Sequence, residues 1–299
     1  MNYCCGPERL SDLYANVIVA QKVRTSKMST NATSQPTWHH QESVVETPGR
    51  HIALREPVAR LVVVLPVFNE AKVIHKTIDA VLHAARGDSG IAFVFADDGS
   101  TDGTPDRIET AIGVSGLNNV QLRRNTRNRG KASVVRDAVL QTNAPFVCFT
   151  DGDLAYSLDH VPQIEAALMS ADVVIGSRSL VHRDERNVKL ARRVLGWGFN
   201  KLARLALWLP YRDTQAGLKG FRRDAAISVF SRQQLTDFSF DVELVFIARR
   251  RGLKIAQIPA RVSEDHAAKA TKVDLIRDPL RMLRGVAVIR LNAWLGRYR

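Results

Sequence analysis

FVCFTDGD, at residues 146–153, joins a short apolar run to two carboxylates that flank a glycine. The apolar half predicts a buried strand of a parallel sheet, and such sheets bind ligands at the carboxyl ends of their strands. Asp151 and Asp153 are therefore expected at a ligand site. Their carboxylates offer oxygen ligands to Mg²⁺ or Mn²⁺, and Gly152 lets the backbone approach a diphosphate. The alternative is a simple Asx turn after the strand.

Three further apolar runs are followed by polar residues in the same way. The runs are 61–68, 91–96 and 172–176, and the polar residues that follow them are Asn69, Glu70, Asp97, Asp98, Ser177 and Arg178. Because the carboxyl ends of parallel strands meet at one edge of a sheet, these side chains are expected to line a cleft.

Helical segments separate the runs. Residues 70–86 have apolar side chains at helical spacing, with Asn69 as the expected N-cap. Thr104 and Pro105 indicate the N-cap and first residue of a second helix. The alternation of strands and helices predicts an α/β fold, a doubly wound and mostly parallel sheet with helices on both faces.

NRGKA, at residues 128–132, predicts a basic turn that opens a helix. Gly130 and Lys131 are the expected contacts for diphosphate oxygens at such a helix N-terminus. Arg127 and Arg129 are equally well explained as solvated surface charges.

The order of the motifs resembles that of inverting family 2 glycosyltransferases with a GT-A fold. The resemblance covers about residues 58–262 and is strongest to the polyprenyl-phosphate sugar synthases, the dolichyl-phosphate glucose and mannose synthase group. The motifs that carry it are PVFNE at 66–70, DDGSTDGT at 97–104, NRGKA at 128–132, DGD at 151–153, GSR at 176–178, DTQAGLKGF at 213–221 and FSFDVEL at 238–244.

The resemblance implies a nucleotide-sugar site made of Pro66, Asn69, Glu70, Asp97, Asp98, Gly130, Lys131 and Gly152. Asp97 and Asp98 have an alternative role, which is to cap the turn through Gly99 and Ser100. The metal site implied is Asp151 and Asp153, with Mg²⁺ or Mn²⁺ as cofactor.

The resemblance also implies an acceptor, a lipid phosphate, that is already ionised at neutral pH and needs no general base. Arg178 and Arg193 would grip this phosphate, with Arg192 as an alternative to Arg193. Asp213, Gln215, Asp241 and Glu243 would lie beside the donor sugar and the acceptor, although Asp241 is also a candidate N-cap. Some relatives differ from this chain at Ala155 and Gly196, which affects the expected metal and phosphate geometry.

The positive charge of the chain is concentrated in two segments. The formal net charge is +13 and the pI is about 10.1. Residues 178–212 hold nine Lys and Arg against two acidic residues, and residues 269–299 hold eight against two. Both segments have helical apolar spacing and contain Trp, which suits an anionic membrane surface. Packing of these helices on their own domain is the alternative.

Three regions are therefore expected: a disordered arm at 1–57, a GT-A domain at 58–262 and a basic amphipathic, membrane-facing segment at 263–299. We expect neither a signal peptide, because residues 1–30 lack a continuous apolar core, nor a transmembrane helix, because no apolar run is long enough to cross a membrane. Its three cysteines do not suggest a disulfide framework. The expected location is the cytoplasmic face of a membrane, with peripheral attachment.

The function expected from these features is inverting transfer of a hexose from a nucleotide sugar to a polyprenyl phosphate. UDP-glucose is the first candidate for the donor. A family 2 enzyme with a soluble or glycan acceptor is the nearest alternative, and it would need a carboxylate base. A nucleic-acid-binding protein is disfavoured because the sheet-edge carboxylates would repel phosphate, and a Rossmann dehydrogenase because its glycine motif is missing. The oligomeric state is not indicated.

Overall fold

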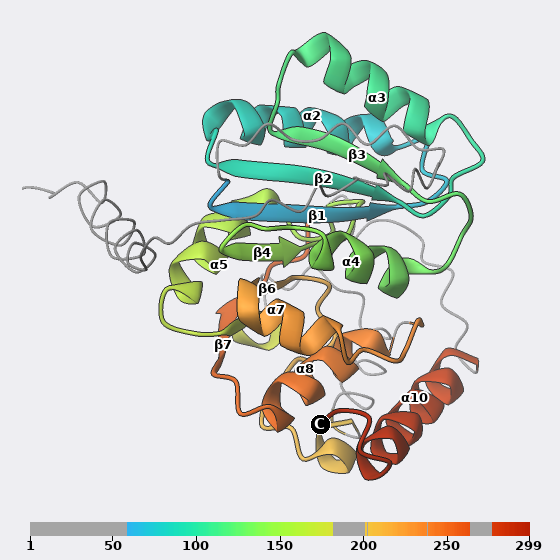
Figure 1. Ribbon diagram of the computed structural model, residues 1–299, viewed down its shortest axis with the longest axis vertical. Helices are drawn as coiled ribbons and strands as arrows, with labels where there is room; N and C mark the ends of the chain where they lie inside the picture. The colour runs from blue at the N-terminus through green and yellow to red at the C-terminus, as the bar shows by residue number, and fades with distance from the viewer. Residues whose placement is uncertain (1–58, 182–200, 202, 238, 264–276) are drawn as a thin grey trace, which may run out of the picture. The chain divides into compact units, whose positions relative to one another are not determined.

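The computed structural model describes residues 59–181, 201, 203–237, 239–263 and 277–299 (Figure 1). The chain separates into two units, Met1–Ile52 and Ala53–Arg299, and everything described below lies in the second. The predicted disordered arm at 1–57 and the predicted phosphate ligand Arg193 lie outside the described residues.

The described strands form one seven-stranded mixed sheet with the order β3-β2-β1-β4-β6-β5-β7. Only β6 runs antiparallel to its neighbours β4 and β5 among these strands. The strands are β1 Leu61–Val67, β2 Ile91–Asp97, β3 Val120–Arg124, β4 Phe146–Phe149, β5 Val173–Ser177, β6 Lys219–Arg222 and β7 Ile255–Pro259. The predicted doubly wound, mostly parallel sheet is confirmed, and all its strands lie inside the predicted 58–262 domain, whose boundaries stay a prediction.

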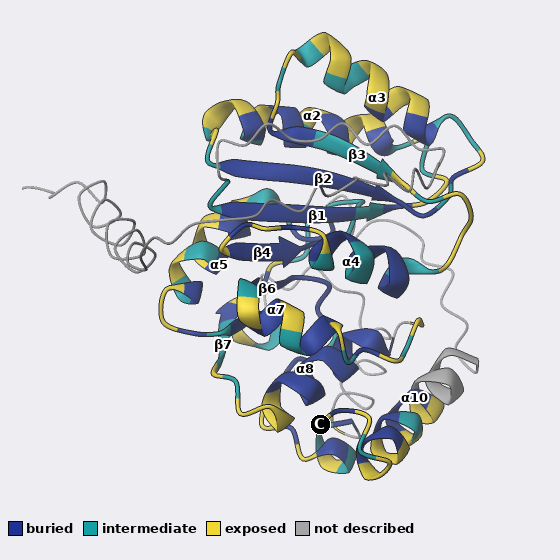
Figure 2. Cartoon of the chain, in the orientation of Figure 1, coloured by how far each residue is buried: buried dark blue, intermediate teal, exposed yellow. Residues whose placement is uncertain are grey.

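Helices cover both faces of the sheet, as predicted. They are α2 Ile74–Gly87, α3 Thr104–Ser115, α4 Lys131–Leu140, α5 Val161–Leu168, α7 Arg223–Phe230, α8 Phe240–Arg250 and α10 Arg277–Trp294, with short 3₁₀ turns η1 Leu158–His160 and η2 Arg178–Leu180. Alternate residues of β1 enter two different cores: Val62 and Val64 pack with α4, α7 and α8, whereas Leu61 and Val63 pack with α2 and α5. Figure 2 shows that the inner strands are buried, that the edge strands β3 and β7 are only partly buried, and that the outer faces of the helices are exposed.

Two predicted helix starts are wrong. Helix α2 begins at Ile74, not at residue 70, because Asn69 has a left-handed φ of 52° and its side chain accepts a hydrogen bond from Thr101 N–H instead of capping a helix. Helix α3 begins one residue early, with Gly103 at the N-cap. The Asp102 carboxylate accepts from the backbone and hydroxyl of Thr104, which is the role expected of an N-cap side chain.

Helix α10 follows the part of the C-terminal segment that lies outside the described residues. From Leu283 onward one side of it is buried, through Val286, Ile289, Asn292 and Ala293. The other side is exposed and mixes the apolar residues Leu283, Ala287, Leu291 and Trp294 with the basic residues Arg284 and Arg290. A helix with one apolar face was predicted, and the observed helix instead has apolar residues on two faces. Its membrane-facing role stays a prediction.

Candidate active site

The loops that follow β1 and β2 are joined at the carboxyl edge of the sheet. Asn69 N–H donates to Ser100 Oγ at 2.9 Å, and Thr101 N–H donates to Asn69 Oδ1 at 2.9 Å. Glu70 N–H donates to Thr104 Oγ1 at 2.8 Å. Pro66 lies near the end of β1, opposite Ala96 of β2. The structure therefore holds Asn69 and Glu70 against the loop that follows β2. The predicted contact of Pro66, Asn69 and Glu70 with a nucleotide stays a prediction.

Asp97 and Asp98 are buried and hold neighbouring loops. Asp97 accepts from the Ser100 backbone N–H at 3.1 Å and also from its hydroxyl. Asp98 accepts from the backbone N–H groups of Arg129 and Gly130 at 2.9 and 2.7 Å. Asp97 thus fills the turn-capping role that was its alternative, and Asp98 fixes the basic turn at 128–131. Their predicted contact with a nucleotide stays a prediction.

The basic turn depends on two glycines. Gly130 has φ +91°, which a side chain would disfavour, and Gly99 has φ +76°. A Cβ on Gly99 would come within 2.5 Å of the Arg127 backbone, so only glycine allows these two loops to meet. Lys131 then starts α4 with its side chain directed toward the end of β4.

Lys131 forms an ion pair with Asp151. Burial lowers the pKa of Lys131, but the carboxylates of Asp151, Asp241 and Asp153 outweigh it and hold that pKa above its ordinary value. The ammonium nitrogen also lies 5.7 Å from the centre of the Phe240 ring. Lys131 is therefore a fixed positive charge beside the predicted metal ligands.

The DGD turn fits a divalent cation that also binds a diphosphate. A Cβ on Gly217 would lie 2.3 Å from Asp151 Oδ2, so this glycine keeps space beside the carboxylate. Gly152 packs against the Pro66 carbonyl, and Asp153 Oδ1 accepts from Ala155 N–H at 3.2 Å. No group of three or more His, Cys, Asp or Glu among the described residues makes a metal site by itself. Mg²⁺ commonly binds one or two carboxylates and completes its shell with phosphates and water.

Arg178 and Asp213 are paired at the end of β5. Arg178 Nε donates to Asp213 Oδ2 at 2.7 Å, Nη2 donates to Oδ1 at 3.0 Å, and the Arg178 backbone N–H also donates to Oδ2. Burial raises the pKa of Asp213, but the Arg178 guanidinium outweighs it and holds that pKa below its ordinary value. Gln215 lies beside the pair, and its backbone N–H donates to Asp213 Oδ1. The carboxylate therefore orients the arginine.

Lys219 was not predicted as a functional residue, yet it is buried beside the site. Its ammonium donates to Asp241 Oδ1 and to the Ala216 carbonyl, both at 2.6 Å. Burial raises the pKa of Asp241, and Lys219 and Lys131 oppose that effect only in part. The alternative that Asp241 is an N-cap is wrong, because α8 has Ser239 at that position. The available signal was that Lys219 lies inside the DTQAGLKGF motif.

Glu243 has its carboxylate occupied within the protein. It accepts from Tyr298 Oη at 2.6 Å and from the backbone N–H groups of Gln234 and Leu235. None of these contacts joins Glu243 to Asp151 or Arg178 at the carboxyl edge of the sheet. The predicted contact of Glu243 with the sugar stays a prediction.

Solved structures show the same fold. The chain matches glucosyl-3-phosphoglycerate synthase from Mycobacterium tuberculosis, crystallised with Mn²⁺, UDP and glucosyl-3-phosphoglycerate, with a TM-score of 0.54 and 21% identity over 78% of this chain and 79% of that one. The same enzyme with Mg²⁺ and UDP matches with a TM-score of 0.54 and 20% identity over 78% and 79% of the two chains. The fold is that of the GT-A glycosyltransferases.

Sequence comparison gives the family. Residues 62–230 match the model of "Glycosyl transferase family 2". The chain is 30% identical to the dolichyl-phosphate beta-glucosyltransferase of Saccharomyces cerevisiae over 80% of this chain and 76% of that protein. It is 28% identical to the human dolichyl-phosphate beta-glucosyltransferase over 80% and 81% of the two chains. The chain belongs to glycosyl transferase family 2 and is a glycosyltransferase.

Proposed function

We propose that this enzyme transfers glucose from UDP-glucose to a polyprenyl phosphate of the dolichyl class, with inversion at the sugar carbon. The similarity to dolichyl-phosphate beta-glucosyltransferases supports the acceptor and the sugar. UDP in structures of the same fold is consistent with the nucleotide.

The observation that carries this proposal is the pairing of Asp213 with Arg178. An acceptor hydroxyl would need a carboxylate base, whereas Asp213 is held by hydrogen bonds from a guanidinium and Asp241 is held by Lys219. A phosphate acceptor has a second pKa near 6, so it is largely ionised at neutral pH and reacts without a base. The pairing thus favours a phosphate over a hydroxyl as the nucleophile.

On the donor side, Lys131 and the N–H groups at the start of α4 would face the diphosphate. Asp98 fixes that turn through two hydrogen bonds, so the positive charge is oriented before the donor arrives. Asp151 and Asp153 would hold Mg²⁺ or Mn²⁺, which would stabilise the charge that develops on the leaving UDP.

On the acceptor side, Arg178 would bind the lipid phosphate. Its side chain is 38% exposed, whereas that of Asp213 is 5% exposed, so the arginine can reach a ligand while its partner stays buried. Nη1 takes no part in the hydrogen bonds to Asp213 and can donate to a phosphate oxygen. Arg193 is the second proposed phosphate ligand.

We also propose that the enzyme attaches to the cytoplasmic face of a membrane through a surface made of Leu205, Trp208, Arg290, Leu291 and Trp294, here called the Trp208–Trp294 surface. Trp208 and Trp294 are 78% and 82% exposed. Arg290 connects the two segments, because its Nε donates to the Ala206 carbonyl and its guanidinium lies 5.7 Å from the Trp208 ring. Trp294 lies one helical turn after Arg290.

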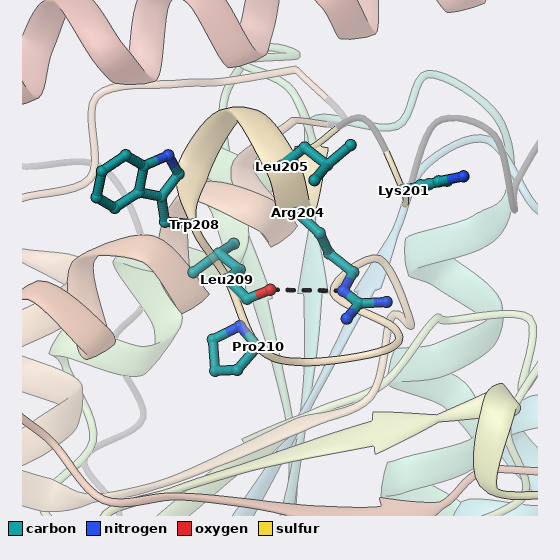
Figure 3. A pocket seen from close by; sticks show the side chains of 6 residues that line it. All are labelled: Lys201, Arg204, Leu205, Trp208, Leu209 and Pro210. Carbon is teal, nitrogen blue, oxygen red and sulfur yellow. Dashed lines mark hydrogen bonds between the residues drawn. The ribbon is translucent and has the colours of Figure 1, made fainter.

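A pocket of about 420 Å³ adjoins this surface (Figure 3). Its apolar walls are Leu205, Trp208, Leu209 and Pro210, and its basic side chains are Lys201 and Arg204. Trp208 has a left-handed φ of 55°, which costs roughly 1–2 kcal/mol for a residue other than glycine. This backbone keeps a large indole exposed beside cations, the combination that suits an anionic lipid interface. No helix among the described residues is long and apolar enough to span a bilayer.

The donor is tested by incubating the purified protein with Mg²⁺, a short polyprenyl phosphate and, in separate reactions, UDP-glucose, UDP-N-acetylglucosamine or GDP-mannose. Mass spectrometry should find the lipid heavier by one hexose with UDP-glucose. A hexosylated lipid formed only from GDP-mannose would contradict the proposed donor, and an unchanged lipid in every reaction would contradict the proposed acceptor.

A further inference from the structure

Tyr298 is fully buried, although it follows the end of α10. Its hydroxyl donates to Glu243 Oε1 at 2.6 Å and accepts from Asn292 Nδ2 at 3.3 Å. Its ring lies 5.9 Å from the ring of Phe246 on α8. The side chain thus has a packing contact and a separate polar contact, which different substitutions can remove.

Glu243 receives three donors in a site without solvent exposure. Besides Tyr298, the backbone N–H of Gln234 donates to Oε1 at 3.0 Å and that of Leu235 donates to Oε2 at 2.9 Å. Burial raises the pKa of Glu243, and these three hydrogen bonds oppose that rise. Because a buried carboxylate depends on each donor it accepts from, the Tyr298 hydroxyl helps to fix where the loop at 233–237 lies.

The loop at 233–237 lies against the turn that starts α4. Gln233 Nε2 donates to the Ala132 carbonyl at 3.1 Å and to the Leu235 carbonyl at 3.0 Å. A Cβ on Gly130 would come within 3.1 Å of the Thr236 carbonyl oxygen. The loop therefore contacts Gly130 and Ala132, the residues on either side of Lys131.

Residues that flank this loop on both sides also contact the C-terminal segment. Arg232 Nε donates to the Arg299 carbonyl at 2.7 Å. Gly285 of α10 faces Ser239, where a Cβ would come within 2.0 Å of the Ser239 hydroxyl. A continuous set of contacts thus runs from residues 285–299, through Tyr298, Glu243 and the loop at 233–237, to the Gly130–Lys131 turn.

We propose that Tyr298 is a positioning residue for donor binding, which acts through Glu243 and the loop at 233–237 on the Gly130–Lys131 turn. The inference rests on the proposed function, because it takes that turn as the diphosphate site. It makes the placement of the C-terminal segment, which carries three of the five residues of the Trp208–Trp294 surface, a determinant of affinity for the nucleotide sugar.

The test is Tyr298→Phe in the full chain, because this substitution keeps the ring against Phe246 and removes only the hydroxyl. Calorimetry with UDP-glucose and Mg²⁺ should give a dissociation constant about fivefold higher than that of the wild type, since a hydrogen bond to a carboxylate is lost and only part of the effect reaches the turn. The kcat at saturating UDP-glucose should change by less than about twofold, because Tyr298 does not contact the reacting atoms.

Phe246→Leu is the matched control, since it weakens the packing around Tyr298 and leaves the hydroxyl in place. It should lower Tm and leave the dissociation constant of UDP-glucose within about twofold. Glu243→Gln combined with Tyr298→Phe should weaken donor binding by less than the product of the two single effects, because both act on one contact.

Wild-type affinity in Tyr298→Phe would overturn the inference. Equal loss of affinity in Phe246→Leu would also overturn it, because loss of folding stability would then explain both. Failure of the wild-type protein to bind UDP-glucose would overturn the proposed function itself, and this result is distinct from the other two.

Discussion

Carboxylate–cation pairs at the carboxyl edge of the sheet differ in how far solvent reaches them. The side chains of Lys131 and Asp151 are each 28% exposed, whereas those of Lys219 and Asp241 are 1% and 8% exposed. A ligand can therefore reach the first pair, while the second is internal. The internal pair keeps two opposite charges beside Lys131 without adding net charge to the site.

Asp153→Ala should reduce glucosyl transfer by more than about 100-fold, because it removes one of two carboxylates proposed to hold the metal. EDTA should have the same effect on the wild type, and added Mg²⁺ or Mn²⁺ should reverse it. Asp106→Asn, an exposed carboxylate in the first turn of α3, is the matched control and should keep full activity. Full wild-type activity in EDTA would contradict the metal role.

Arg178→Ala should raise the KM for the polyprenyl phosphate more than that for UDP-glucose, because the guanidinium is proposed to bind the acceptor. Arg178→Lys should restore the KM only in part, since an ammonium cannot reproduce the paired hydrogen bonds of Arg178 with Asp213. Steady-state kinetics with each substrate varied in turn measures this difference. An unchanged acceptor KM in Arg178→Ala would reject the assignment, and Arg107→Lys on the exposed side of α3 serves as control.

At the scale of elements, α10 has a buried face that packs on the domain and an exposed face that we propose for membrane contact, and its apolar pattern alone does not separate the two. Val286 and Ile289 face the domain, and Leu291 and Trp294 face outward. Truncating the chain before α10 would remove Tyr298 together with the helix and leave Glu243 buried with one donor fewer. Membrane attachment is therefore tested with substitutions on the exposed face.

Trp208→Glu combined with Trp294→Glu should greatly reduce sedimentation with anionic liposomes, because it replaces two exposed indoles with charges that anionic lipids repel. Each nearby Lys or Arg contributes about 1 kcal/mol to such binding, so wild-type sedimentation should also weaken with salt. Val114→Glu, at a position 85% exposed on α3, is the matched control and should bind as the wild type does. Failure of the wild type to bind anionic liposomes at low salt would contradict the membrane surface.

At the scale of the whole molecule, the sequence predicts the strands with continuous apolar runs, which are β1, β2, β4 and β5. It does not reveal β3, β6 and β7, because VQLRR, KGFR and IAQIP are short and contain polar residues. These strands are stabilised by pairing with neighbours, which a local pattern cannot show. The buried ion pair of Lys219 could not be predicted from the sequence for the same reason, because only the fold places Asp241 beside Lys219.

The candidate site, like the fold, could be predicted from the sequence only in part. The position of Asp151 and Asp153 after a buried strand can be predicted, because strand ends in a parallel sheet share one edge. The pairing of Asp213 with Arg178, and that of Glu243 with Tyr298, joins residues 35 and 55 positions apart. Spacing alone carries no information on such contacts, so the sequence indicates which residues matter and the structure indicates how each is oriented.

The central claim is that a lipid phosphate, and not a soluble acceptor, receives the glucose. Its most direct test is a competition between two acceptors in one reaction. The purified full-length protein is incubated in mild detergent with Mg²⁺, radiolabelled UDP-glucose and equal concentrations of a short polyprenyl phosphate and 3-phosphoglycerate. We expect the label to move into the organic phase as a glucosyl lipid phosphate. Label that stays in the aqueous phase as a glucosyl phosphoglycerate would contradict the claim.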